Sequence, residues 1–498
     1  MPRFRPFPIF FTAMAKFNLP GHSALLLGIG GSGMSSLAHI LLDMGVSVYG
    51  YDKKSTAVTS YLTERGAKIA GNLDQIEIKD IEFMVFSSAI NDKNHSIFED
   101  AKNLNIPMFH RSDVLHKIFS QKKSISVAGS HGKTSTTAMI AQVLKDQNLS
   151  PSVMVGGEVP FLGKRGGQFG AGEWGVYESD ESDGTFLKHK ANLRIITNID
   201  NDHLDFYHSR EKLEEAFFRY IATDTPGHVI VQGMDEGIRN MICHLFQPKP
   251  ENQNFNLWIL LNLNSLDLEY KDKLDQIRKH LTKNLHIIPY EFKKNGISFQ
   301  VQEQTYQLEL PFSGQHYSLN GLTAFIALHI VGIPAISIQA GLNAYQGVKR
   351  RQEVLGTANS ITVIDDYGHH PTEIATVIHS LKNQKKDNGK LIVLFQPHRY
   401  TRTANLKNEL ADSLVNADYI FLLPIYSAGE AIIPGISSES IAENLNSNPW
   451  KILKGEVVED VTVIDAHLHP GDTLLCIGAG NVRDWGEYYL QEKSKLKK

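Results

Sequence analysis

A short glycine-rich segment holds the residue types that bind nucleotide phosphates. Gly129-Ser-His-Gly132-Lys133-Thr134 lies between an apolar strand signal, 124–128, and a predicted helix, 135–144. Backbone N–H groups of such a turn face an anion, the lysine adds charge for the β- and γ-phosphates, and the threonine hydroxyl suits Mg2+. Val127 replaces the first glycine of the full pattern, so this is a shortened P-loop whose flanking elements favour ATP over a structural loop. The predicted ATP-binding residues here are Gly129, Ser130, His131, Gly132, Lys133, Thr134 and Ser135.

A second glycine-rich loop lies near the start of the chain. Gly28-Ile-Gly30-Gly31-Ser32-Gly33 fits G-x-G-x-x-G, follows the apolar run 24–27 and opens a predicted helix, 34–44. The next predicted strand ends at Asp52, the spacing at which an acidic residue reaches a ribose hydroxyl. If this G-x-G-x-x-G motif were the only one in the chain, it would suggest NAD binding, or no more than a tight turn. Because the chain carries a second phosphate loop with Lys-Thr, we instead expect ATP and a second, nucleotide-like ligand.

Two acidic segments follow predicted strands beyond the shortened P-loop. The run Glu178-Ser-Asp180-Glu181-Ser-Asp183 contains four carboxylates in six residues. Such a run is usually a solvated loop, but its position after a strand suggests a Mg2+ site, because Mg2+ prefers carboxylate and phosphate oxygens. The second segment, 198–205, contains His203 among three aspartates. This histidine could hold a second cation or could be a structural hydrogen-bonding residue, and the sequence favours neither.

The last third of the chain adds two polar clusters after predicted strands. Asp365–Thr372 contains adjacent histidines, but no third ligand has a spacing suited to zinc. Gln396–Arg402 places Arg399 and Arg402 three residues apart. Paired arginines can clamp a carboxylate or a phosphate, whereas a single arginine in such a loop would usually form surface salt bridges.

Strand and helix signals alternate along most of the 498 residues, which predicts an α/β protein with parallel sheets. This length favours about three domains. The polar, basic segment 121–123 predicts the first boundary, and the renewed alternation of strand and helix signals near residue 350 predicts the second. The predicted domains are therefore 1–120, 121–349 and 350–498. The first 21 residues are expected to be an unstructured extension with Met14 as the true start, and the Asn- and Lys-rich stretch 252–294 to be peripheral.

The composition narrows the class of protein. The net charge is −4 and no basic run stands out, which argues against nucleic acid as a partner. Two cysteines far apart suggest neither a disulfide framework nor a cysteine metal site and fit a cytoplasmic protein. No apolar run approaches the roughly 20 residues of a membrane span, so no membrane partner is expected.

These motifs together resemble the Mur ligases of peptidoglycan synthesis, from about residue 23 to residue 481. The family implies an N-terminal Rossmann-like domain for a UDP-sugar, a central P-loop ATPase with a mixed sheet, and a C-terminal Rossmann-like domain that brings the amino acid. Two strings point to the branch that adds alanine, since other Mur ligases differ there. The most specific strings are 28–34, 129–134, 178–183, 197–203, 365–372 and 396–403. The last two of these are the strings that point to the alanine-adding branch.

The resemblance implies an ATP-dependent ligase that joins L-alanine to the lactyl carboxylate of UDP-N-acetylmuramate through an acyl phosphate. Lys133 would neutralise the transferred phosphoryl group, and Thr134, Glu178 and His203 would hold Mg2+. Arg351 and Asp366 would contact ATP, and Asn320 would lie near the adenine. The expected UDP-sugar residues are Gly28, Gly30, Gly31, Ser32, Gly33, Asp52, Ser87 and Ser88; the expected amino-acid residues are Tyr367, His369, His398, Arg399 and Arg402.

Two positions depart from the family pattern. Tyr317 follows Gly314-Gln-His316 where the family usually has asparagine, and Gln352 stands where an aromatic residue commonly follows the paired arginines. Both departures bear on ATP contacts and neither on the phosphoryl-transfer residues, so we expect an active enzyme, as a monomer or a homodimer. The alternatives are a recycling ligase that attaches a preformed tripeptide, a non-catalytic UDP-sugar-binding protein, and an NAD-dependent oxidoreductase.

Overall fold

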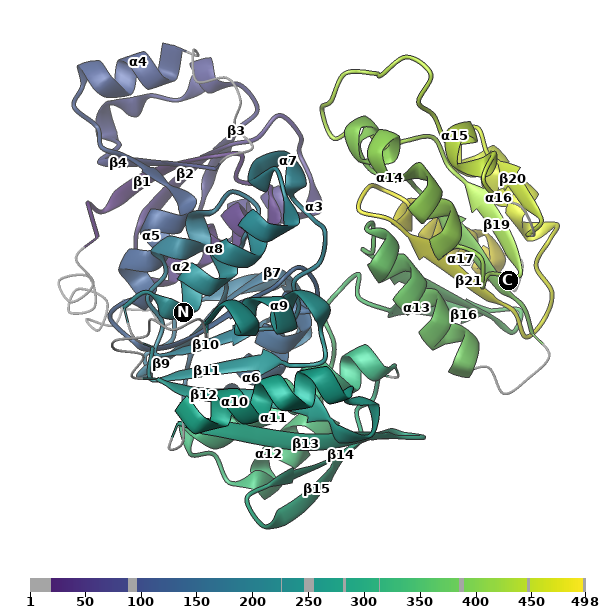
Figure 1. Ribbon diagram of the computed structural model, residues 1–498. Coiled ribbons are helices and arrows are strands. Elements are labelled where there is room, and N and C mark those ends of the chain that lie inside the picture. Colours follow the sequence, from purple (N-terminus) through teal and green to yellow (C-terminus); the bar gives the residue numbers. More distant parts are fainter. Residues whose placement is uncertain are drawn as a thin grey trace, which may run out of the picture. The chain divides into compact units, whose positions relative to one another are not determined.

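The computed structural model describes residues 19–87, 96–224, 226–245, 255–280, 284–312, 314–384, 389–445 and 448–495 (Figure 1). Met14 and most of the predicted N-terminal extension lie outside these residues. The chain divides into two compact units, one of Met1–Pro311 with Ser318–Gln346 and one of Phe312–Tyr317 with Gly347–Lys498. No helix in the described ranges is long and apolar enough to cross a membrane.

The first unit begins with a five-stranded parallel sheet in the order β3-β2-β1-β4-β5. Every residue of β1 (Ser23–Leu27) is buried, as expected for the central strand of a sheet covered on both faces. The strand order reverses between β1 and β4, which places the Gly28–Gly33 loop at the switch point where open α/β sheets bind ligands. The other elements are β2 (Ser47–Tyr51), β3 (Lys68–Ala70), β4 (Phe83–Phe86), β5 (Met108–His110), α2 (Ser32–Asp43), α3 (Ala57–Glu64), α4 (Ser96–Asn103) and α5 (Arg111–Phe119).

The same unit continues with a ten-stranded mixed sheet in the order β15-β14-β13-β12-β11-β10-β6-β9-β7-β8. The central strands pair in parallel in the order β13-β12-β11-β10-β6-β9-β7. At one edge β8 pairs antiparallel with β7, and at the other β14 pairs antiparallel with β13 and β15 with β14. The strands are β6 (Lys123–Ala128), β7 (Ser152–Val159), β8 (Arg165–Gln168), β9 (Trp174–Glu178), β10 (Leu193–Ile196), β11 (His228–Gln232), β12 (Asn256–Asn262), β13 (Leu285–Lys293), β14 (Gly296–Val301) and β15 (Gln304–Leu308). The helices are α6 (Lys133–Asp146), α7 (Leu204–Tyr207), α8 (Arg210–Ala222), α9 (Glu236–Leu245), α10 (Leu268–His280), α11 (Gln315–Val331) and α12 (Ala335–Asn343).

The prediction that residues 252–294 are peripheral is wrong. This stretch supplies β12 and β13, two parallel strands of the ten-stranded sheet, together with α10. Leu257 and Ile259 are fully buried. The apolar run 257–261 is a strand signal that the surrounding asparagines and lysines obscure in a reading of composition alone.

The second unit contains a six-stranded sheet in the order β16-β17-β21-β18-β19-β20, parallel except for the β16–β17 hairpin. Helices α13 and α14 pack with one apolar cluster of this sheet, and α16 and α17 with the other. The three sheets with their helices confirm the predicted α/β class. The elements are β16 (Glu353–Ala358), β17 (Ile361–Asp366), β18 (Leu391–Phe395), β19 (Tyr419–Leu422), β20 (Trp450–Ile452), β21 (Thr473–Ile477), α13 (Pro371–Gln384), α14 (Tyr400–Ser413), α15 (Glu439–Ala442), α16 (Val457–Asp465) and α17 (Arg483–Lys495).

Within the first unit, α2 packs closely against β7 and the edge strand β8 of the larger sheet. Ser36 donates its hydroxyl to Val155 O at 2.8 Å. A Cβ atom on Gly167 would lie 1.9 Å from Ser36 O, so only glycine permits this approach. The helix that follows the first glycine-rich loop is therefore fixed to the sheet that carries the second.

Gly167→Ala is expected to destabilise this junction, because a backbone carbonyl cannot rotate away as a side chain can. Overpacking of this kind costs about 1–3 kcal/mol. Urea unfolding of the variant and the wild type measures the difference. Gly71→Ala is the control, since nothing lies within 4 Å of its added Cβ. Equal loss of stability in both variants would contradict a tight α2–β8 contact.

A buried histidine lies on the same helix. His39 is 2% exposed, and its Nδ1 lies 2.9 Å from Nη1 of Arg65. A guanidinium only donates, so Nδ1 must accept and the ring must be neutral. Burial, reinforced by Arg65 and Arg165, lowers the pKa of His39 to about 3.

The neutral His39 predicts a loss of stability in acid. The unfolded chain binds a proton at this residue below its ordinary pKa of about 6.5, whereas the folded chain does not until about pH 3. The free energy of unfolding therefore falls as the pH is lowered through this window, by about 1.4 kcal/mol between about pH 7.5 and about pH 5.5. His39→Gln keeps an acceptor for Arg65 and should lose about that much less between the two pH values in urea unfolding. An unchanged pH dependence would show that His39 titrates normally in the folded chain.

Candidate functional site

The shortened P-loop connects the end of β6 to the start of α6. Gly129 and Gly132 have φ angles of 125° and 83°, a backbone region that favours glycine. The neighbouring segment after β10 holds the loop, because Asn198 Oδ1 accepts the His131 N–H at 2.8 Å and Thr197 donates to His131 O at 2.5 Å. Of the predicted ATP-binding residues, 129–132 thus form the turn and 133–135 begin the 14-residue helix that follows it.

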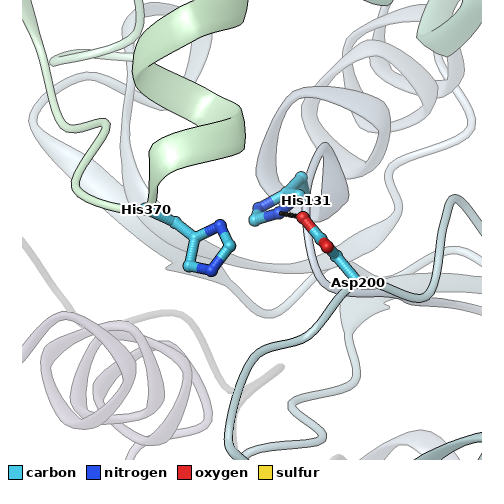
Figure 2. A group of neighbouring side chains, drawn as sticks. All are labelled: His131, Asp200 and His370. Carbon is cyan, nitrogen blue, oxygen red and sulfur yellow. Dashed lines mark hydrogen bonds and ion pairs between the residues drawn. The ribbon is translucent and has the colours of Figure 1, made fainter. Parts of the chain in front are cut away.

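The imidazole of His131 is part of the same framework. Its Nε2 lies 2.9 Å from Oδ2 of Asp200, and Figure 2 shows the two side chains meeting. His370, drawn in the same view, belongs to the second unit. Sequence reasoning assigned His131 to nucleotide binding but did not find Asp200 as its partner.

Lys133 at the first position of α6 lies against the acidic segment that follows β9. Its Nζ donates to Glu181 Oε1 at 2.7 Å, to Gly129 O at 2.5 Å and to Ser130 O at 3.2 Å. Burial disfavours the ammonium, but the carboxylates of Glu181 and Asp180 outweigh it, so the pKa of Lys133 is raised. The lysine is therefore charged and held beside the loop.

The three predicted Mg2+ residues come from three different elements around this loop. Thr134 follows Lys133 in α6 and is 9% exposed. Glu178 ends β9, and its Oε1 accepts the Gly156 N–H at 2.6 Å. His203 precedes α7 with a φ of 58°, and its Nε2 lies 3.8 Å from Glu181. The hydroxyl of Thr134 and the carboxylate of Glu178 are the hard oxygen ligands that Mg2+ prefers, and the imidazole of His203 is a nitrogen ligand that divalent metals also accept.

Asn320 in α11 lies next to the P-loop, and its contact with adenine stays a prediction. A Cβ atom on Gly132 would lie 2.8 Å from Asn320 Oδ1. The side chain also accepts a hydrogen bond from Gln232, which ends β11, at 3.4 Å. The side chain of Asn320 therefore lies beside Gly132 of the phosphate loop and is held there by Gln232.

The first glycine-rich loop forms the turn between β1 and α2. Gly28 has a φ of 73°, and Gly30 donates its N–H to Asp52 Oδ2 at 2.9 Å. Asp52 thus stabilises the loop itself, in addition to its predicted role at a ribose. Gly31 caps α2 without a side-chain hydrogen bond, so the first turn of α2 keeps amide groups for an anion. Ser87 follows β4, and Ser88 lies outside the described residues.

Arg111 lies beside the first glycine-rich loop, and the sequence did not predict it as a site residue. Its Nη1 lies where a Cβ atom on Gly33 would be, 1.7 Å from that position. Its Nη2 forms an ion pair with Asp180 Oδ2 at 3.2 Å. The guanidinium therefore links the first glycine-rich loop to the acidic segment beside Lys133. No local motif marks Arg111, since it begins an ordinary helix.

In the second unit, Arg351 and Asp366 lie at the ends of the β16–β17 hairpin. Arg351 contacts the ring of Tyr367 at 5.4 Å and Glu373 at 3.5 Å. Asp366 accepts the N–H groups of Gln352 at 2.8 Å and Gly368 at 2.7 Å, and burial raises its pKa to about 6. The predicted pair is thus brought together with Tyr367.

The two residues that depart from the family pattern also lie in this unit. The hydroxyl of Tyr317 donates to Arg351 O at 3.1 Å, and its ring stacks on Phe312. Gln352 is 6% exposed, and its side-chain Nε2 lies 3.4 Å from His316 Nε2. Tyr317 therefore holds the backbone of Arg351, and Gln352 contacts the neighbouring His316.

The predicted amino-acid residues gather between β17 and α14. The rings of His369 and His398 are 5.7 Å apart, and Arg402 Nη1 lies 3.4 Å from His398 Nδ1. Burial, with His369 and Arg402, lowers the pKa of His398 to about 3. Tyr426 stacks on His398 with 9° between the ring planes. Sequence reasoning missed Tyr426, although an aromatic residue shortly after β19 was an available signal.

Arg399 differs from Arg402 in its surroundings. Its backbone has a φ of 68°, and its Nε lies 4.0 Å from Glu430. The side chain of Arg399 is 50% exposed. The structure thus brings together the rings of Tyr367, His369 and His398 with Arg402, while the Arg399 guanidinium has Glu430 as a neighbour.

Comparisons with known proteins cover almost the whole chain. Three family descriptions match: "Mur ligase family, catalytic domain" over residues 25–123, "Mur ligase middle domain" over 127–328, and "Mur ligase, glutamate ligase domain" over 350–480. A UDP-N-acetylmuramate–L-alanine ligase of Dictyoglomus turgidum is 37% identical over 94% of this chain and 96% of its own length. The corresponding ligase of Aquifex aeolicus is 36% identical over 94% and 96%. The crystal structure of a UDP-N-acetylmuramate–alanine ligase from Thermotoga maritima superimposes with a TM-score of 0.75 at 25% identity, over 95% of this chain and 99% of that one.

Proposed function

The chain belongs to the Mur ligase family, and from this membership we propose that it joins L-alanine to UDP-N-acetylmuramate with the cleavage of ATP to ADP and phosphate. The likeness to alanine ligases over almost the full length of both chains carries this assignment. The charged Lys133 beside the acidic segment agrees with phosphoryl transfer from ATP.

Each of the three sheets carries one of the predicted sites, for the UDP-sugar, for ATP and for alanine. The Gly28–Gly33 loop, with Asp52, Ser87 and Ser88, binds the UDP-sugar through the N-terminus of α2. Residues 129–135 and Asn320 bind ATP, assisted by Arg351 and Asp366 of the second unit. We retain the domain boundaries at residues 120 and 349, a cytoplasmic location and a monomer or homodimer as parts of this proposal.

The lactyl carboxylate of the sugar attacks the γ-phosphorus of ATP, which gives an acyl phosphate and releases ADP. Both reactants are anionic, so Lys133 lowers the barrier by neutralising the phosphoryl oxygens. Thr134, Glu178 and His203 are suited to hold Mg2+, which would screen the same charges. The amine of alanine then attacks the acyl carbon, and phosphate leaves as the amide forms.

The cluster around His398 binds the alanine. Arg402, together with Arg399, pairs with the alanine carboxylate, as arginine does in bidentate contacts. The rings of Tyr367, His369 and His398 form the aromatic wall of the pocket. The depressed pKa of His398 keeps its ring neutral at pH 7, so it adds no competing positive charge.

Phosphate release from ATP and Mg2+, measured with UDP-N-acetylmuramate and L-alanine added singly and together, tests the proposal. Release that requires both substrates is the expected result. Preformed tripeptide that outcompetes alanine would instead identify a recycling ligase. Intact ATP with UDP-sugar still bound would identify a binding protein, and Tyr317 would be the first residue to replace by asparagine.

A further inference from the structure

The acidic segment after β9 contains a buried carboxylate to which the predicted site gives no role. The side chain of Glu181 is 1% exposed. Its Oε1 accepts a hydrogen bond from Lys133, whereas its Oε2 is buried and accepts none from any residue in the described ranges. A buried carboxylate oxygen without a donor is unfavourable, so Oε2 requires a positively charged or donating partner.

His203 is the metal-ligating side chain next to this carboxylate. Its Nε2 lies 3.8 Å from Glu181 Oε1, and its backbone has the left-handed φ of 58° that non-glycine residues rarely adopt. Tyr207 donates its hydroxyl to Glu181 O at 2.5 Å, which ties α7 to the acidic segment. The imidazole and the carboxylate are therefore held close together by the fold.

The separation of these two side chains suits a shared cation. With bonds of about 2.1 Å in octahedral geometry, adjacent ligand atoms lie about 3.0 Å apart and opposite ones about 4.2 Å apart. Nε2 of His203 lies 3.8 Å from Oε1 of Glu181, between these two separations, so the imidazole is close enough to this carboxylate group for one cation to bind both side chains. Small side-chain rotations would bring both residues onto one ion.

We propose that Glu181 is a ligand of the divalent cation and that its carboxylate connects the phosphate-binding lysine to the cation site. Oε1 holds Lys133, and the second oxygen of the same carboxylate, Oε2, turns toward the cation that His203 also binds. The adjacent Asp180 is already paired with Arg111, whereas Glu181 has a buried oxygen that no described residue hydrogen-bonds. This inference rests on the proposed function, because the cation is the one that accompanies ATP.

Glu181→Gln tests the proposal, since the amide keeps the size of the side chain and removes its charge. Mn2+ is the probe, and the electron paramagnetic resonance signal of free Mn2+ measures binding in the presence of a non-hydrolysable ATP analogue. We expect Mn2+ to bind at least about tenfold more weakly to the variant. Glu214→Gln is the matched control, because Glu214 is a buried glutamate paired with Arg210 in α8. It should bind Mn2+ as the wild type does.

Equal Mn2+ affinity in Glu181→Gln and the wild type would overturn the proposal and leave Glu181 as a counter-ion of Lys133 alone. Failure of the wild type to bind Mn2+ with the nucleotide, or to release phosphate, would refute the proposed function instead. Thermal unfolding and UDP-N-acetylmuramate binding establish that each variant is folded. If Glu181→Gln does not fold, Glu181→Asp, which keeps the charge but withdraws it by one methylene, should still weaken Mn2+ binding relative to Glu214→Gln.

Discussion

Lys133→Ala is expected to abolish ligation while leaving the binding of UDP-N-acetylmuramate largely intact. The lysine is the positive charge of the P-loop, and loss of one such stabilising group lowers turnover by about 10²–10³-fold or more. The UDP-sugar loop, Gly28–Gly33, belongs to a different sheet and should be unaffected. Phosphate release measures the first effect and equilibrium binding of the UDP-sugar the second.

The ion pair of Lys133 with Glu181 requires a control for stability. Removing one partner of a buried pair leaves an uncompensated charge, at a cost of about 3–5 kcal/mol. The double variant Lys133→Ala with Glu181→Gln removes both charges and should recover much of that stability without recovering turnover. Parallel loss of turnover and UDP-sugar binding in the stable double variant would show that the two loops do not have separate roles.

The local strand–loop–helix units were predictable from sequence because each is encoded in a short window. The apolar run 124–128 and the glycine turn after it predict β6 and α6, and the structure has both, with α6 beginning at Lys133. The same holds for β1 and α2 around Gly28–Gly33. Apolar runs and glycines at a turn act through neighbouring residues, so no tertiary information is needed.

The partners of the site residues were not predictable in this way. Lys133 pairs with Glu181 across 48 positions, and Arg111 pairs with Asp180 across 69. The sequence presents four similar carboxylates at 178–183, and only the course of β9 and its loop decides which of them turns toward the lysine. Tyr426 reaches His398 for the same reason, through the parallel bridge that joins their two loops.

Arg402→Ala is expected to raise the KM for L-alanine by about tenfold to a hundredfold, with a much smaller effect on the KM for ATP. A charged hydrogen bond to a carboxylate contributes about 1.5–3 kcal/mol, and this residue lies beside His398 in the proposed alanine pocket. Initial rates measured against each substrate separate the two constants.

Arg399→Ala provides a sharper comparison than a distant residue, because the two arginines lie one turn apart at the start of α14. The Arg399 side chain is half exposed and neighbours Glu430, so its removal should raise the KM for alanine less than removal of Arg402. Lys407→Ala, further along the same helix, controls for loss of a positive charge and should leave both constants unchanged. Equal increases for alanine and ATP in Arg402→Ala would remove Arg402 from the amino-acid pocket, since a carboxylate clamp acts mainly on the substrate it holds.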